Sequence, residues 1–418
     1  MPTLTEDSAG IETLAPIQAG IEVALLTGCQ DRPYAFGIST ALASKGIKVD
    51  VIGSDEVDSP EMHDTSNLHF VNMLGSQLQN IGFAKKLSIW LRYYARLTRY
   101  AANAKPGIFH ILWNNKFEHF DRTFLMLYYK LLGKKIVFTA HNVNQARRDR
   151  KDSLLNRLTL RIQYHLSDHI FVHTDRMGKD LLQDFGVKER AVTVIPFGIN
   201  NSLPNTELTP ALARQRLGIE NGEKAILFLG RMRPYKGLEY LLSAFRLLKS
   251  RNADYRLIIA GPEKKGSEDY MEKIRRSIRE QFNSDDVILR IQFIPDEEME
   301  VYLKAADVLV LPYKEIFQSG VLFLGYSFGL PVVATDVGSF REEIIEGETG
   351  FLCRPADPAD LAKTVETFFE SSLYKELPRR RSEIRKYAHA RYSWDSVGEM
   401  TRRAYAELLR ENRESSFR

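Results

Sequence analysis

Short apolar runs alternate with helical patterns along almost the whole chain. Runs typical of buried strands occupy residues 21–27, 47–52, 68–73, 108–113, 136–140, 169–173 and 191–195 in the first half. In the second half they occupy residues 225–229, 256–260, 287–291, 308–311 and 331–334. Apolar residues three and four positions apart predict helices between many of them, for example at 38–44, 120–132, 153–165, 238–249, 268–282, 296–305 and 321–328. The pattern predicts an α/β protein with doubly wound parallel sheets.

The alternation stops once, at residues 196–210. This segment, PFGINNSLPNTELTP, is rich in Pro, Asn, Gly and Thr and has the composition of a domain linker. We therefore predict a flexible leader at 1–19, an N-terminal domain at 20–200, a linker at 201–210, a C-terminal domain at 211–392, and a last helix at 393–418 that can pack back on the N-terminal domain. Two such domains place a ligand-binding cleft between the carboxyl ends of their strands.

One strand–turn–helix segment has the chemistry of an anion site. An apolar run ends at Gly230, a short turn holds Arg231, Arg233 and Lys236, and helical spacing begins after Gly237. A helix N-terminus favours negative charge, and an Arg and a Lys in the connecting turn can clamp a diphosphate. The segment is neither a Walker loop nor a G-x-G-x-x-G fingerprint. An ordinary turn with a basic loop is the alternative.

The composition mainly excludes other classes of protein. The 418 residues carry a formal net charge of only +4, and 44% of them are hydrophobic, which is enough for two cores. No apolar stretch has the length of a membrane span, and residues 1–19 lack the features of a signal peptide. Cys29 and Cys353 show no metal or redox spacing, so we interpret them as buried free thiols in a reducing compartment. We expect a cytoplasmic protein.

A series of short motifs is spread over residues 139–352. The second half contains LGRMRPYKG (229–237), LIIAGPE (257–263), FIPDEEMEVYLKAADVLVLPY (293–313), GLPVVATDVGSFREEI (329–344) and GETGFL (347–352). The first half contains TAHN (139–142), FVHTDRMGKDLLQDFGV (171–187) and VIPFGIN (194–200). In order and spacing they resemble the retaining nucleotide-sugar glycosyltransferases of family 4. That resemblance implies the GT-B architecture, with two Rossmann-like domains facing a cleft, the acceptor on the N-terminal side and the donor on the C-terminal side.

The resemblance places Arg231 and Lys236 on the donor diphosphate. Charge grows on this leaving group as the glycosidic bond breaks, and fixed cations stabilise it. The further donor contacts we expect are Gly230, Gly261, Phe293, Glu315, Ser319, Gly320 and Val321. Ser319 and Gly320 open a predicted helix, so their N–H groups can meet phosphate. The donor would be a UDP-, GDP- or ADP-sugar, and we expect neither a metal nor another cofactor.

The segment 312–331 departs from the family pattern. Family members usually carry two glutamates eight positions apart here, one for the donor sugar and one for the ribose. Alignment on Gly-Leu-Pro (329–331) puts Ile316 and Leu324 at these positions. The second glutamate is therefore missing. Glu315 either replaces the first one by a shift of one position, and is then catalytic, or is an exposed loop carboxylate.

On the acceptor side, His141 ends the apolar run IVFTAH. At this place an imidazole can bond a sugar hydroxyl or assist proton transfer, and the resemblance implies a cleft histidine here. We predict that His110 and His173 pack in or beside the sheet.

A second acceptor element is the loop GCQDRPY (28–34), which stands where family members carry a glycine-rich loop. Its Gly28, Asp31 and Arg32, together with Asn142, are the acceptor contacts we expect. The acidic, polar stretch 55–66 is predicted as a loop.

Basic residues gather in the segment 81–161, which holds 17 Lys and Arg but 4 Asp and Glu. Within it, apolar residues at helical spacing are flanked by basic ones: Phe83, Leu87, Trp90, Leu91, Tyr94 and Leu97. Such a helix can lie on an anionic membrane surface, or it can face the core with a solvated basic side. The cluster continues through Arg147, Arg148, Arg150 and Lys151. No motif for nucleic acid accompanies the charge.

The sequence thus predicts a retaining glycosyltransferase acting on a saccharide or lipid-linked acceptor, cytoplasmic or peripheral on the inner face of the plasma membrane. Its expected catalytic residues are His141, Arg231, Lys236 and Glu315. A non-catalytic sugar-binding or nucleotide-sugar-binding protein of the same fold is the alternative, motivated by the missing glutamate.

Overall fold

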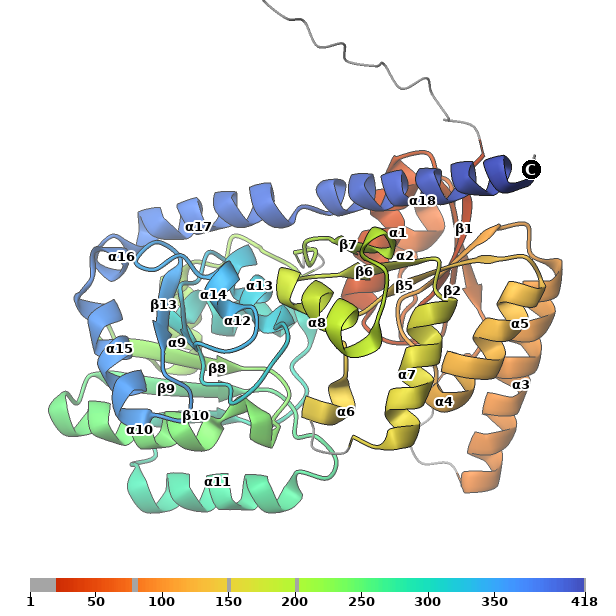
Figure 1. The fold of residues 1–418 in the computed structure, drawn as a ribbon. Helices are drawn as coiled ribbons and strands as arrows, with labels where there is room; N and C mark the ends of the chain where they lie inside the picture. The colour runs from red at the N-terminus through yellow and green to blue at the C-terminus, as the bar shows by residue number, and fades with distance from the viewer. Residues whose placement is uncertain (1–19, 77–81, 149–151, 200–202, 417–418) are drawn as a thin grey trace, which may run out of the picture.

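Two parallel β-sheets, each packed among helices, lie side by side in the computed structural model (Figure 1). The structure describes residues 20–76, 82–148, 152–199 and 203–416. The predicted leader at 1–19 lies outside the described residues, as do Arg150, Lys151 and the first two residues of the predicted linker.

The first sheet has seven strands in the order β3-β2-β1-β4-β5-β6-β7. Their bounds are β1 (Glu22–Leu26), β2 (Lys48–Gly53), β3 (Leu68–Asn72), β4 (Ile108–Ile111), β5 (Lys135–Thr139), β6 (His169–Val172) and β7 (Val192–Val194). β4 and β6 are buried at every position, as parallel strands covered on both faces are. The strand order reverses between β1 and β4, so the loops after these strands flank a crevice.

The second sheet has six strands in the order β10-β9-β8-β11-β12-β13. Their bounds are β8 (Lys224–Leu229), β9 (Tyr255–Ala260), β10 (Val287–Arg290), β11 (Val308–Leu311), β12 (Val332–Thr335) and β13 (Gly350–Cys353). Every predicted strand is present, with its ends shifted by at most two residues. β13 is the one strand the apolar pattern missed in the described chain, because this four-residue edge strand is only partly buried.

Helices fill the connections between the strands. In the first half these are α1 (Arg32–Ser44), α2 (Pro60–Asp64), α3 (Phe83–Asn103), α4 (Glu118–Phe120), the π-helical turn η1 (Asp121–Leu125), α5 (Met126–Leu131), α6 (Gln145–Arg148), α7 (Leu154–Leu166), α8 (Asp175–Phe185) and η2 (Glu189–Ala191). In the second half they are α9 (Pro210–Leu217), η3 (Pro234–Lys236), α10 (Leu238–Arg251), α11 (Glu268–Gln281), α12 (Asp296–Ala305), α13 (Gly320–Ser327), α14 (Phe340–Glu343), α15 (Pro358–Glu370), α16 (Ser372–Lys375), α17 (Leu377–Tyr392) and α18 (Trp394–Ser416).

Two local predictions are wrong. The predicted loop 55–66 contains the short helix α2, which begins at a proline with preset backbone geometry. The predicted loop 28–34 ends early, because the Asp31 carboxylate accepts a hydrogen bond from the Tyr34 N–H (3.3 Å) and starts α1 at Arg32. The predicted helix 120–132, in contrast, is confirmed, with a π-helical turn between α4 and α5.

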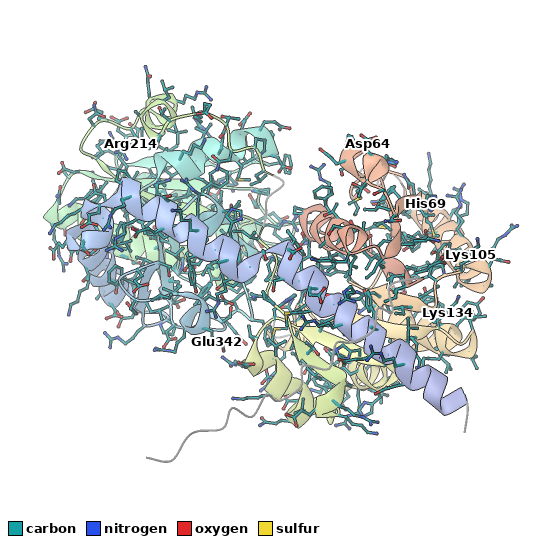
Figure 2. All side chains as sticks on the ribbon, turned by 90° about the horizontal axis from the view of Figure 1, so that it is seen from above. Asp64, His69, Lys105, Lys134, Arg214 and Glu342 are labelled. Atoms are coloured by element: carbon teal, nitrogen blue, oxygen red, sulfur yellow. The ribbon has the colours of Figure 1, made fainter. Side chains whose placement is uncertain are left out.

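The last two helices cross from one sheet to the other (Figure 1). Seen from above, α17 covers part of the second half and α18 continues over the first (Figure 2). Where they meet, the Trp394 ring lies against Gly37 of α1 and against Gly198, and its Nε1–H donates to the Ile199 carbonyl (2.8 Å). A Cβ at Gly37 would stand 2.0 Å from the indole, so this packing requires glycine.

Candidate functional site

The turns after β8 and β11 face each other, because the strand order of the second sheet reverses between these strands. The Lys314 N–H donates to the Tyr235 carbonyl (2.8 Å) and joins the two turns. Gly237 has a φ of 68°, and a Cβ there would lie 2.0 Å from the Pro312 carbonyl oxygen. Only glycine permits this close approach, which holds the turn η3 and its Lys236 at the switch point.

Lys236 is a buried cation with no hydrogen-bond or ion-pair partner in the described part of the chain. The residue is 6% exposed, and its Nζ lies 5.3 Å from the centroid of the Tyr313 ring. Burial, helped by the charges of Arg233 and Arg231, lowers the pKa of Lys236 to about 7. Burying a charge without a counterion costs free energy. An anion that binds here and pairs with Lys236 would remove part of that cost.

Two predicted donor positions, Gly230 and Val321, lie beside this ammonium. A Cβ at Gly230 would lie 2.8 Å from Lys236 Nζ and 3.2 Å from Val321 Cγ2. The space that glycine leaves open is therefore directly beside the amine. Gly261 packs against Gly230. Its N–H donates to the Arg290 carbonyl (3.0 Å), and because Gly261 has no side chain, the Gly230 carbonyl can approach it closely. Arg231 is exposed at the edge of the turn.

α13 begins at Gly320, as predicted, directly after the buried Ser319. The Ser319 side chain does not cap the helix, and its Oγ lies 3.5 Å from the Tyr313 hydroxyl. Phe293 lies apart from this group, in the connection from β10 to α12, and is 73% exposed.

The structure keeps both interpretations of Glu315 open. This carboxylate is exposed, and no hydrogen bond or ion pair to it occurs among the described residues. Ile316 is buried, and Leu324 packs against the core of the second half, so both positions aligned with the family glutamates are packing positions. Lys314, beside Glu315, pairs with Glu239 (2.8 Å).

His141 lies in an aromatic enclosure at the carboxyl end of the first sheet. Its ring stacks on Trp113 at 4.1 Å between centroids and meets the edge of Tyr34 at 4.6 Å. Burial, with His173 and His110 nearby, holds the pKa of His141 well below its usual range. Burial also lowers the pKa of His173 to about 4, so both imidazoles are neutral near pH 7.

The hydrogen-bond chain fixes the direction in which His141 can act. The Ile195 carbonyl can only accept, so His173 Nδ1–H donates to it (3.2 Å). His173 Nε2 must then accept from His141 Nδ1–H (3.1 Å). His141 Nε2 is left as a buried acceptor without a partner among the described residues, which suits a substrate hydroxyl. His110 is held in the sheet by Tyr405 (2.6 Å) and Thr139 (2.7 Å), as predicted.

Phe197 connects the two halves of the site. Its ring stacks on Phe323 of α13 at 5.3 Å and lies 6.1 Å from His141 and 5.1 Å from His173. A Cβ at Gly320 would meet the Phe197 ring at 3.8 Å. Thus His141 and the start of α13, which borders Gly230 and Lys236, belong to one continuous lining.

The predicted acceptor residues are divided between two places. Gly28 packs against the loop after β4, where a Cβ would lie 2.7 Å from the Trp113 carbonyl oxygen. Asp31 caps α1, and Arg32 pairs with Asp296 of α12 across the two halves (3.3 Å). Asn142, in contrast, lines a cavity of about 330 Å³ together with His141.

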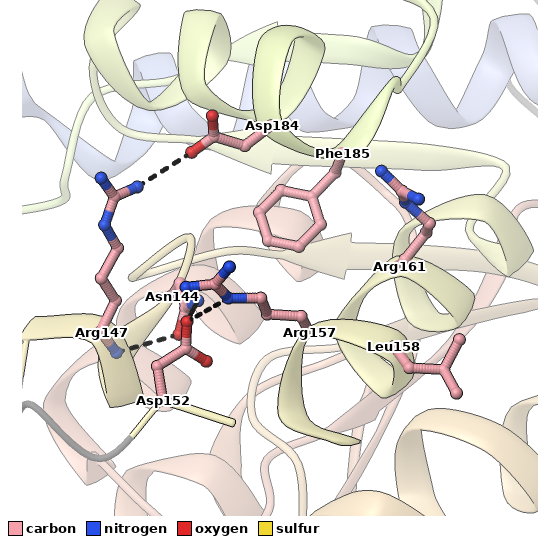
Figure 3. Close-up of a pocket in the computed structure, with 8 residues that line it drawn as sticks. All are labelled: Asn144, Arg147, Asp152, Arg157, Leu158, Arg161, Asp184 and Phe185. Carbon is pink, nitrogen blue, oxygen red and sulfur yellow. Dashed lines mark hydrogen bonds and ion pairs between the residues drawn. The ribbon is translucent and has the colours of Figure 1, made fainter. Parts of the chain in front are cut away.

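A second cavity, of about 490 Å³, lies among α6, α7 and α8 (Figure 3). It contains three arginines, two of which are paired: Arg147 with Asp184 (3.2 Å) and Arg157 with Asp152 (2.6 Å). Arg161 lines it without a carboxylate in the described chain. Most of the arginine charge in this cavity is therefore paired with carboxylates, whereas the charge of Lys236 is not.

The apolar pattern did not identify the residues that surround His141. Tyr34, Trp113, His173 and Phe197 come from four different connections, and each looks like a core or loop residue in its own segment. The one available signal was position, since Trp113, His173 and Phe197 follow the ends of β4, β6 and β7 within three residues. Both cysteines are buried thiols outside any disulfide, as predicted.

Both halves of the chain match known protein families. Residues 33–203 match the family described as "Glycosyltransferase Family 4", and residues 211–391 match "Glycosyl transferases group 1". The D-inositol 3-phosphate glycosyltransferase of Corynebacterium diphtheriae is 25% identical over 396 residues, which cover 90% of this chain and 88% of that protein. The protein of the same name from Acidothermus cellulolyticus is 28% identical over 255 residues, covering 59% of this chain and 55% of its own.

Two solved structures share the architecture. Sucrose-phosphate synthase from Thermosynechococcus elongatus matches with a TM-score of 0.74 at 19% identity, covering 93% of this chain and 99% of its own. Anabaena HepE, in complex with UDP-glucose, matches with a TM-score of 0.70 at 16% identity and the same coverage of both chains. The fold is the GT-B architecture of two Rossmann-like domains.

Proposed function

This chain belongs to family 4 of the retaining glycosyltransferases, which use nucleotide-sugar donors, and from that premise we propose how it works and on what. The acceptor is a hydroxyl of a saccharide or of a lipid-linked saccharide, in the synthesis of a polysaccharide or glycoconjugate. The observation that carries the proposal is Lys236, a buried and uncompensated ammonium at the switch point of the second sheet.

In the proposed reaction, the diphosphate lies against Lys236, Arg231 and the start of α13. The bond from the anomeric carbon to the diphosphate oxygen breaks, and both electrons leave with the nucleoside diphosphate. The acceptor oxygen bonds the same carbon from the same face, and its proton passes late to a phosphate oxygen. His141 Nε2 accepts a hydrogen bond from a hydroxyl of the donor sugar or acceptor, while Lys236 and Arg231 stabilise the charge of the leaving group without a divalent metal.

The second candidate is a protein that binds nucleotide sugars without transferring them, and Leu324 in place of a glutamate is the observation that favours it. Incubation with UDP-, GDP- and ADP-sugars separates the two. The proposed enzyme releases nucleoside diphosphate from at least one donor, faster when acceptor saccharides are added. A pure binder is stabilised thermally by a nucleotide sugar but releases nothing.

The segments of α3, α4 with the residue before it, η1, α5 and α7 carry most of the exposed large apolar side chains of the described chain. They are Leu87, Leu91, Phe117, Phe120, Phe124, Leu127, Leu131, Leu154, Leu155 and Leu158. Four of them follow one helical stripe at 120, 124, 127 and 131. The predicted apolar stripe of α3 is divided, because Tyr94 and Leu97 are buried while Leu87 and Leu91 face outward.

No described helix is long and apolar enough to cross a membrane. The outward apolar stripe and the basic excess of 81–161 support binding on an anionic lipid surface instead, which would bring a lipid-linked acceptor to the cleft.

We therefore expect the protein to float with anionic liposomes at low salt and to dissociate at high salt. The triple variant Phe124→Ser, Leu127→Ser, Leu131→Ser should bind at least about tenfold more weakly, because it removes three inserted side chains. Leu212→Ser is the matched control, since Leu212 is 49% exposed but lies on α9 of the other half. Wild-type protein that stays with the soluble fraction at low salt would rule out the membrane surface.

A further inference from the structure

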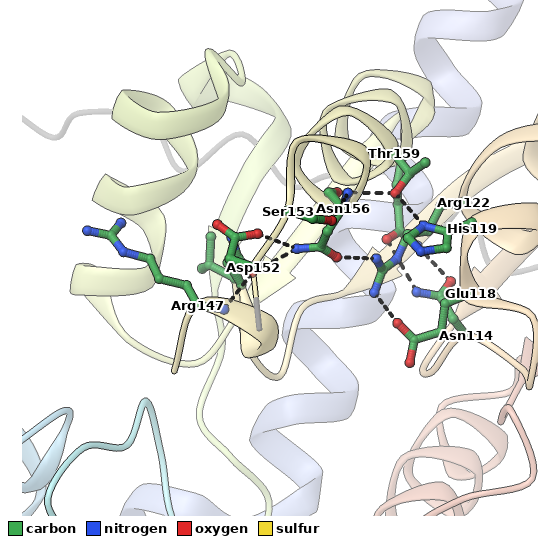
Figure 4. Close-up of polar contacts among 12 residues, drawn as sticks. Asn114, Glu118, His119, Arg122, Arg147, Asp152, Ser153, Asn156 and Thr159 are labelled. Atoms are coloured by element: carbon green, nitrogen blue, oxygen red, sulfur yellow. Dashed lines mark hydrogen bonds and ion pairs between the residues drawn. The ribbon is translucent and has the colours of Figure 1, made fainter. Parts of the chain in front are cut away.

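The cavity beside His141 has the chemistry of a site for a neutral sugar ring. It has a volume of about 330 Å³ and lies between the carboxyl ends of β4 and β5 and the inner side of α7. Figure 4 shows the polar network along one side of it, with side chains from α4, η1 and α7 pointing toward one another. All residues that line this cavity belong to the first half of the chain.

The charges of the cavity cancel. Among the described residues that line it, only Glu118 and Arg122 are ionic, and they form an ion pair with each other. Arg122 Nη1 also donates to Asn156 Oδ1 (2.8 Å). The neighbouring His141 is neutral for the reasons given above. No uncompensated positive charge therefore remains on the described wall to bind an anionic group.

Paired amides form a second part of the wall. Asn114 Nδ2 donates to Gln163 Oε1 (3.3 Å), and Gln163 Nε2 donates back to Asn114 Oδ1 (2.8 Å). Gln163 is fully buried, whereas Asn114 is half-buried. A primary amide has two N–H donors and two acceptor lone pairs. Asn114 therefore keeps one donor and one lone pair, the combination that a pair of neighbouring hydroxyls on a sugar ring satisfies.

Two buried polar atoms of the lining have no hydrogen-bond partner among the described residues. One is Arg122 Nε, on a residue only 9% exposed, and the other is His141 Nε2. The first can only donate, and the second can only accept in the tautomer derived above. Leaving buried polar atoms unpaired costs free energy, which a hydrogen bond from a ligand would recover.

We propose that this cavity holds an uncharged polyhydroxylated ring of the acceptor and discriminates against the phosphorylated form of the same ring. The proposal rests on the proposed function, of which it names the acceptor class. A phosphate dianion in the cavity would lie near Glu118 and find Arg122 already neutralised. The acceptor would in this respect differ from that in the name of the relatives, D-inositol 3-phosphate glycosyltransferase.

The test is ligand-observed saturation-transfer NMR with the full-length chain. The probes are glucose, mannose, galactose and myo-inositol, each beside its monophosphate. We expect at least one neutral ring to bind, and each phosphate to bind more weakly than its neutral form. Asn114→Ala should weaken binding of the neutral ring by about tenfold, since it removes one or two hydrogen bonds.

Two controls keep the outcome interpretable. Asn103→Ala changes an amide at the end of α3, outside the cavity, and should leave ring binding unchanged. Thermal stabilisation of the wild-type chain by nucleotide sugars reports separately whether the proposed function holds. The cavity proposal is overturned if the phosphates bind more tightly than the neutral rings, if no neutral ring binds, or if a correctly folded Asn114→Ala variant binds them as wild type does.

Discussion

Replacing Lys236 with alanine is expected to reduce the rate of sugar transfer by about 1,000-fold. In the proposed reaction the Lys236 ammonium lies beside the leaving diphosphate, and because the side chain is buried its charge acts more strongly there than in water. The loss should fall mainly on kcat, because the interaction strengthens as the glycosidic bond breaks. Steady-state kinetics with the donor selected by the nucleotide-release assay measure it.

The same substitution should leave the fold intact. Lys236 has no hydrogen-bond or ion-pair partner in the described chain, and burial already disfavours its charged form, so alanine removes an electrostatic cost as well as a side chain. Lys224→Ala is the matched control: Lys224 begins the same strand, β8, at its opposite end, and turnover should stay within about twofold of wild type. A near-normal rate of sugar transfer by Lys236→Ala would show that Lys236 does not stabilise the leaving diphosphate.

The second large effect is expected at Gly37, where Ala should destabilise the protein by about 3 kcal/mol. Alanine normally stabilises a helix relative to glycine. Here its Cβ would overlap the Trp394 ring, which must move and lose its bond to the Ile199 carbonyl. Turnover should fall too, because Tyr34 packs against both Trp394 (5.1 Å) and His141 (4.6 Å).

Denaturant unfolding followed by tryptophan fluorescence measures this change. Gly178→Ala in α8 is the control, since a Cβ there meets its nearest atoms at 3.9 Å and the variant should be as stable as wild type or up to about 1 kcal/mol more stable. If Gly37→Ala were stabilised like the control, Trp394 would not be wedged against α1 as the structure has it.

The parts of the molecule that the sequence could predict are those with local causes. Most strands consist largely of apolar residues, because parallel strands covered on both faces bury most of their side chains, and β4, β6, β11 and β12 are buried at every position. The turn around Lys236 was likewise visible, since the strand, the glycines and the basic residues stand within one short segment. The site residues of this turn converge because β8 and β11 are neighbours, which follows from the fold.

What the sequence could not predict depends on contacts between distant segments. The tautomer of His141 is set by His173 and the Ile195 carbonyl, and its enclosure by Trp113 and Tyr34. The Asn114–Gln163 amide pair joins residues 49 positions apart. The ion pair of Arg32 with Asp296 spans both halves, so a side chain predicted to contact the acceptor also ties α1 to α12. No local pattern encodes such pairings.

The central claim is that Lys236 holds the donor diphosphate, and proton uptake on binding tests it most directly. With a pKa of about 7, the free amine is mostly neutral at pH 8 and mostly charged at pH 6. A bound diphosphate favours the charged form, so binding should take up close to one proton at pH 8, much less at pH 6, and weaken as the pH rises above 7.

Calorimetric titration of the accepted nucleotide sugar, in two buffers of different ionisation enthalpy and without acceptor, counts these protons. The predicted result is uptake of about one proton by the wild-type protein at pH 8 and of almost none by Lys236→Met. Binding without proton uptake at pH 8, or equal uptake by Lys236→Met, would contradict the claim.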